Sequence, residues 1–106
     1  MKSENFRHTV FFWLKEPNNQ SHRTAFETSL TKFIECSEFV QNKHLGIPAN
    51  TYRQVIDATY TYCLALSFLN KQDQDNYQVE PAHKIFIEES EALWEKVLVY
   101  DSENIW

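Results

Sequence analysis

The sequence predicts a small α+β domain with the element order βαββαβ. Residues 6–14 and 59–69 are rich in aromatic and β-branched side chains and alternate between two faces, which is typical of strands. Each run is followed by a segment whose apolar residues recur at helical spacing, within residues 21–36 and 81–94. The chain has 106 residues, and we expect one domain over residues 1–106. This order is that of a ferredoxin-like fold, a four-stranded antiparallel sheet with its helices on one face.

The first strand, residues 6–14, has two apolar faces. One face carries Phe6, His8, Val10, Phe12 and Leu14, and the other carries Thr9, Phe11 and Trp13. Because a single layer of helices covers only one face of a sheet, the second face needs another partner. We therefore expect a homodimer in which the helix-free face of one sheet packs against the same face of an identical subunit.

The first helix is expected from an N-cap at Ser21 to about Cys36. A second strand over residues 38–45 is expected at the sheet edge, where Lys43 would discourage stray pairing. Gly46 is the only glycine, so a positive φ is expected there, at the start of a loop that runs to Asp57. Arg53 and Asp57 are suitably spaced to pair across this loop.

The second half of the chain repeats the pattern. The strand over residues 59–69 alternates regularly and is expected to be central. Residues 70–74 are polar and predict a turn, which leads into a short helical turn ending at Tyr77. The second helix is expected from Pro81, whose fixed φ suits a first helical position, to about Trp94. Residues 96–100 form the last expected strand.

The stretch from Asp75 to Phe86 concentrates the usable polar chemistry of the chain. Tyr77, Glu80 and His83 gather where the second helix begins, with His83 in its first turn. A histidine titrates near pH 6.5, so His83 is either a general base or a structural residue hydrogen-bonded to a loop. Tyr77 is either a proton donor or a packing aromatic whose hydroxyl reaches the rim.

The composition and charge of the chain argue against several classes of partner and cofactor. The net charge is −5 and no run of lysine or arginine is present, which argues against nucleic acid and membrane surfaces as partners. The N-terminal residues lack the apolar core of a signal peptide, and two isolated cysteines fit a reducing compartment, so we expect a soluble, cytoplasmic protein. The four histidines show no ligand spacing, and a single glycine cannot build a phosphate-binding loop. We expect neither a metal nor a cofactor.

Three motifs together resemble the stress-responsive A/B barrel (Dabb) family. They are His8-Thr9-Val10-Phe11-Phe12, Gly46-Ile47-Pro48-Ala49 and Asp75-x-Tyr77-x-x-x-Pro81-x-His83-x-x-Phe86. The resemblance implies ferredoxin-like subunits that dimerise sheet to sheet into an α+β barrel. Bacterial members of the family have no settled biochemical role, whereas a related plant member is a polyketide cyclase that uses a tyrosine and a histidine of this motif. Carried over, this implies that Tyr77 and His83 are acid–base candidates and that His8 and Tyr62 line the same cavity.

Two functions remain open. The first is binding of a small apolar or aromatic ligand between the second helix and the sheet, with contacts from His8, Phe12, Tyr62, Glu80 and Phe86. The alternative is a cofactor-independent cyclase, lyase or isomerase that moves protons on a small carbonyl or polyketide-like substrate with His83 and Tyr77. Glu80 stands where the family commonly has a histidine, and its carboxylate is expected to favour protonated His83. A cavity beneath the second helix with His83 and Tyr77 facing into it would favour the enzyme, whereas a filled core would argue against it.

Overall fold

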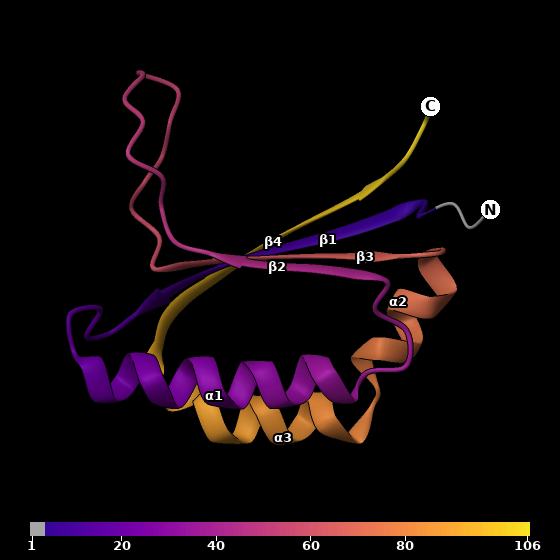
Figure 1. The fold of residues 1–106 in the computed structure, drawn as a ribbon, viewed down its shortest axis with the longest axis horizontal. Helices are drawn as coiled ribbons and strands as arrows, with labels where there is room; N and C mark the ends of the chain where they lie inside the picture. Colours follow the sequence, from indigo (N-terminus) through magenta and orange to yellow (C-terminus); the bar gives the residue numbers. More distant parts are fainter. Residues whose placement is uncertain (1–3) are drawn as a thin grey trace.

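The computed structural model describes residues 4–106 as two layers, a sheet and a pair of helices (Figure 1). The sheet contains β1 (Phe6–Leu14), β2 (Asn42–Gly46), β3 (Tyr62–Phe68) and β4 (Trp94–Glu103). Its strands are antiparallel and ordered β2-β3-β1-β4. The helices are α1 (Gln20–Cys36), α2 (Lys71–Gln78) and α3 (Pro81–Ser90), and a 3-10 turn, η1 (Glu91–Leu93), leads into β4. Since α1 and α3 cover one face, the expected ferredoxin-like fold is confirmed (Figure 1).

The core lies between the helices and the sheet. The predicted inward face of β1 is buried along its whole length. The two central strands are β1 and β3, and the central position of β3 confirms the expectation for it. In this register His8 stands opposite Leu66 of β3 and Asp101 of β4. Apolar side chains thus fill the space between the helices and this face of the sheet.

Several boundaries differ from the expected ones. Helix α1 is capped by Asn19 and not by Ser21, because the Asn19 side chain accepts a hydrogen bond from the His22 amide at 3.1 Å. Strands β2 and β3 begin at Asn42 and Tyr62, four and three residues later than expected. The segment before β2 packs irregularly, with Phe39 and Val40 against the core.

The end of the second main helix and the length of the last strand also differ. Helix α3 ends at Ser90, whose hydroxyl donates to the Phe86 carbonyl at 2.6 Å, and a 3-10 turn follows. Trp94 opens β4 and does not close the helix. Strand β4 runs to Glu103 and pairs with the whole of β1, which makes it longer than the expected residues 96–100.

Gly46 does not adopt the conformation expected for it. Its φ is not positive, so that expectation is wrong. A Cβ at this position would lie 2.6 Å from Nε2 of His44, and this exposed imidazole, the end of a flexible side chain, would have to rotate away. Asp57 is not paired with Arg53, because its carboxylate accepts from the amide of Thr59 at 2.9 Å and from its hydroxyl at 2.7 Å.

Residues 47–61, which we call the arm, rise from the sheet on the side away from α1 and α3 (Figure 1). The base of the arm is fixed by Trp13, whose indole N–H donates to the Thr59 hydroxyl at 3.0 Å. Near its tip Tyr52 and Val55 are each 86% exposed. The arm therefore presents apolar side chains on the helix-free side of the molecule.

The beginning of β1 and the end of β4 lie side by side at one corner of the sheet. The amide of Asn104 donates to the carbonyl of Asn5 at 2.8 Å and so extends the pairing of the two strands. Within residues 4–106, none of the helices combines the length and the apolar character that crossing a membrane requires.

Candidate functional site

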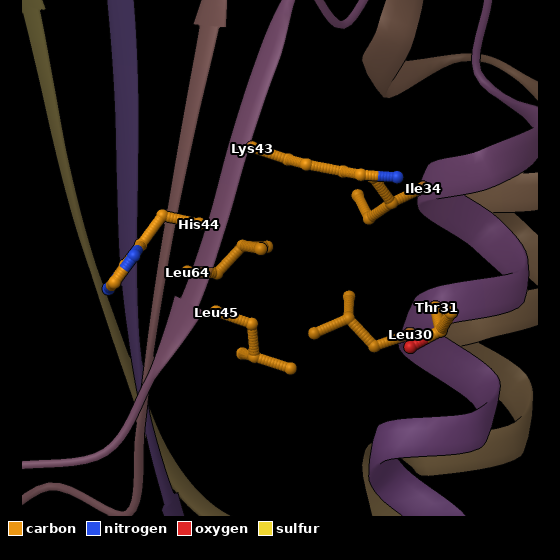
Figure 2. A pocket seen from close by; sticks show the side chains of 7 residues that line it. All are labelled: Leu30, Thr31, Ile34, Lys43, His44, Leu45 and Leu64. Atoms are coloured by element: carbon orange, nitrogen blue, oxygen red, sulfur yellow. The ribbon is translucent and has the colours of Figure 1, made fainter.

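A cleft of about 280 Å³ opens between α1 and the sheet edge (Figure 2). It is lined by Leu30, Thr31, Ile34, Lys43, His44, Leu45 and Leu64. Figure 2 shows Leu45 and Leu64 on the sheet side and Leu30 on α1 facing each other across the gap. The side chain of Lys43 reaches over from β2 toward α1, whereas His44 points away from the helix. The period of two along β2 explains this arrangement, because Lys43 and Leu45 share one face of the strand.

Tyr77 and His83 are brought together, as the sequence predicts. Tyr77 lies at the end of α2 and His83 in the first turn of α3, and only two residues separate these helices. Their ring centroids are 5.6 Å apart in an edge-to-face arrangement. Both rings also pack on Phe33 of α1, at 5.1 and 5.2 Å. Tyr77 is almost fully buried and His83 about half-buried, so the pair sits at the margin of the core.

The surroundings shift the pKa of both groups. Burial, and then the nearby charge of Glu80, raise the pKa of the Tyr77 hydroxyl. Burial lowers the pKa of His83, the nearby charge of His8 lowers it further, and Glu80 acts in the opposite direction. Glu80 raises the pKa of His83, as expected from the sequence, but burial outweighs the carboxylate and the net shift is downward. A lowered pKa favours the neutral form of the imidazole at pH 7.

Glu80 connects two helices. Its carboxylate accepts from the hydroxyl of Ser37 at 2.6 Å and from the amide of Glu38 at 3.3 Å. Ser37 follows the last residue of α1, and Glu80 precedes the first residue of α3. These two hydrogen bonds hold the end of α1 against the start of α3. That Glu80 contacts a ligand stays a prediction.

His8 forms a pair that sequence reasoning missed. Its Nδ1 lies 2.5 Å from Oδ1 of Asp101, and its ring packs edge-to-face against Tyr77 at 5.9 Å. The sequence predicts a last strand that ends at Tyr100, which leaves Asp101 in a polar tail. The pairing of β1 with β4 brings His8 and Asp101 together, and ring contacts connect His8 to Tyr77 and Tyr77 to His83.

The other predicted contact residues fill the space beneath α3. Phe12 packs against Phe26 at 4.9 Å and Phe86 at 6.2 Å, and Tyr62 stacks on Phe26 at 4.7 Å. The hydroxyl of Tyr62 donates to Glu27 at 2.5 Å, and burial followed by this bond raises its pKa. Aromatic rings thus occupy the place expected for a ligand. The cleft lies beside it, toward β2, and the roles of His8, Phe12, Tyr62 and Phe86 in binding stay predictions.

Within residues 4–106, side chains of histidine, cysteine, aspartate and glutamate do not gather in groups of three that could hold a metal ion. The molecule therefore offers two features for function. One is a leucine-lined cleft with the Lys43 ammonium at its rim. The other is the imidazole of His83 next to the buried phenol of Tyr77.

The sheet order, the helices on one face and the tyrosine–histidine pair at the start of α3 define a ferredoxin-like domain of the A/B barrel class. The sequence model of the stress responsive A/B barrel domain (Dabb) matches residues 6–104. The chain therefore belongs to the Dabb family, which confirms the resemblance. A search of curated proteins finds no match.

Solved structures agree with this assignment. A Dabb family protein from Mesorhizobium loti superposes with a TM-score of 0.78 at 22% identity, over 95% of this chain and 97% of that one. A dimeric ferredoxin-like protein of unknown function from Thermobifida fusca gives 0.76 at 13% identity, over 94% and 91%. A hydroxynitrile lyase from Passiflora edulis gives 0.76 at 19% identity, over 95% and 94%. At these identities the similarity shows a shared fold.

Proposed function

We propose that this protein is a homodimer that binds a small apolar ligand in the cleft between α1 and β2. The observation that carries the proposal is the cleft itself, whose walls are mainly leucine and isoleucine and whose polar groups lie at the rim. Such sites bury an apolar molecule and orient it with one or two polar contacts. The volume of about 280 Å³ is at the low end for ligand sites and suits a molecule of one or two rings, or a short chain.

The dimer is supported by the helix-free face of the sheet. A hollow of about 140 Å³ on this face is lined by Phe11, Trp13, Asp57, Tyr60, Leu98 and Tyr100. An exposed apolar surface of this kind marks a contact surface. The similar proteins from Thermobifida fusca and Bacteroides fragilis are described as dimeric. Packing this face against its own copy would leave both ligand clefts on the outer, helical side.

Binding is tested with phenylnaphthylamine, a neutral amine that joins a phenyl group to a naphthyl group and fluoresces when it enters an apolar site. Thr31 lines the cleft and is exposed, so Thr31→Phe should block the opening without disturbing the core. Thr28→Phe is the matched control, because Thr28 is an exposed threonine of the same helix that does not line the cleft. We expect Thr31→Phe to weaken binding by at least about tenfold, which corresponds to about 1.4 kcal/mol, and Thr28→Phe to leave it unchanged. Equal binding by both variants would exclude the cleft as the site.

A second candidate is proton transfer at His83, favoured by the lowered pKa of its imidazole and by the adjacent Tyr77. Because aromatic rings fill the core beneath α3, a substrate would have to reach His83 from the partly exposed side of its ring. The similarity to a hydroxynitrile lyase suggests a substrate for the test. In cleavage of a hydroxynitrile, His83 would accept the hydroxyl proton while the bond to the nitrile carbon breaks and cyanide departs with the electron pair. If this reaction occurs, His83→Ala and Tyr77→Phe should each lower cyanide release from mandelonitrile by about 10² to 10⁴. Absence of release from the wild-type protein would remove hydroxynitrile cleavage as a candidate.

A further inference from the structure

Lys43 is a cation without an internal counter-ion beside an apolar cleft. In the part of the chain that the structure describes, the ion pairs involve His8, His22, Lys32 and Lys71, and Lys43 takes part in none of them. Its ammonium lies near Ile34, at the rim of the space between the leucines (Figure 2). An ammonium group is a strong point charge that binds carboxylates, sulfonates and phosphates.

The other charged groups near Lys43 in residues 4–106 form no ion pair with it. His44 also lines the cleft but turns its ring away from α1 (Figure 2). Glu35 borders a neighbouring hollow together with Lys43, and the carboxylate of Glu4 accepts from the side chain of Asn42 instead. The rim of the cleft therefore carries an ammonium group that is free to pair with a ligand, and Thr31 adds a hydroxyl that can donate a hydrogen bond.

We infer that the ligand is an anionic amphiphile, a small molecule with an apolar body and one carboxylate or sulfonate group. This inference rests on the proposed binding function and names its ligand class. The apolar body lies between Leu30, Leu45 and Leu64, and the anion pairs with Lys43 at the opening. A lysine on an edge strand also discourages strand pairing, but that role alone would give no preference for anions.

Two probes with the same ring system separate these roles. Anilinonaphthalene sulfonate carries an anion, and phenylnaphthylamine lacks it. We expect Lys43→Met to weaken sulfonate binding by about fivefold, the scale of a partly exposed ion pair, and to leave the neutral probe unchanged. Lys32→Met is the matched control, because Lys32 lies on the same helix as Thr31 but is paired with Glu89 at 3.2 Å, away from the cleft.

Salt provides a second measurement. Raising the ionic strength from about 0.05 M to about 0.5 M should weaken sulfonate binding in the wild-type protein and should have little effect in Lys43→Met, because exposed charges are screened. If the neutral probe binds in the cleft but Lys43→Met reduces both probes equally, or neither, the anion inference fails while the binding proposal stands. If Thr31→Phe leaves both probes bound, the cleft is not the site and both proposals fail.

Discussion

Replacing Trp13 by glutamate should convert the proposed dimer into a monomer. Trp13 lies on the helix-free face, where its ring contacts the Lys96 ammonium at 4.5 Å and its indole N–H bonds to Thr59 at the base of the arm. A tryptophan at the centre of an interface typically contributes about 2 kcal/mol or more, which is roughly a 30-fold change in dissociation constant. A carboxylate buried in its place adds a further penalty, although Lys96 is close enough to neutralise part of it. Because both subunits of the dimer lose the tryptophan, we expect the dissociation constant to rise by about 1000-fold.

Light scattering over a dilution series measures this change directly. A dimer has a mass of 25.4 kDa, twice the 12.7 kDa of one chain. Ile85→Glu is the matched control, because it places the same carboxylate on an apolar residue that is 47% exposed on α3, on the opposite layer of the domain. The control should remain dimeric. A mass of 12.7 kDa for the wild-type protein at micromolar concentration would refute the reasoning, and so would a Trp13→Glu variant that dissociates no more readily than Ile85→Glu.

Three further predictions concern pH, metal removal and the contact between the helices. The pKa of His83 is lower in the folded state than its ordinary value of 6.5, so its contribution to stability is complete above pH 6.5 and is lost as the pH falls toward the folded pKa. The free energy of unfolding, measured with urea, should therefore decrease less between about pH 7 and pH 5 in His83→Gln than in the wild type. EDTA should leave the melting temperature unchanged, because no metal-ligand cluster is visible in residues 4–106; a clear decrease would point to a cation that these side chains do not reveal. Glu80→Ala should lower the free energy of unfolding by about 1 kcal/mol, because the Ser37 hydroxyl and the Glu38 amide lose their acceptor; an unchanged value would mean that water replaces the carboxylate without loss.

The sequence predicted the fold well where local chemistry determines it. Strand β1 was predicted with its observed bounds, because aromatic and β-branched residues alternate up to Leu14 and a polar, proline-containing turn follows. Pro81 likewise fixed the start of α3. The start of the first helix was harder to predict, because Asn19 and Ser21 are both residue types that cap helices well. Only the tertiary position of the chain decides which side chain reaches a free amide.

The site was predicted only in part. Tyr77 and His83 meet because they flank a connection of two residues, which the spacing in sequence already indicates. The cleft depends on the distance between α1 and β2, and the His8–Asp101 pair depends on the register of β1 with β4. Neither the distance nor the register can be read from a short stretch of sequence, because each depends on segments that are far apart in the chain. The spacing of two residues between Lys43 and Leu45 was the one available sign of the cleft. It predicts that the two side chains share a face of the strand, but it does not predict which element packs against that face.

The meeting of Asn5 and Asn104 has a consequence for the connectivity of the chain. Because these residues are hydrogen-bonded neighbours, a short linker could join Asn5 to Asn104 without crossing the sheet or the cleft. The chain could then be opened in the arm at Tyr52, which is exposed, because the arm extends away from the helices (Figure 1). The fold should therefore tolerate circular permutation at this point. The permuted chain would keep the cleft intact while cutting the arm. Comparing it with the original chain would therefore separate the role of the arm from ligand binding in the cleft.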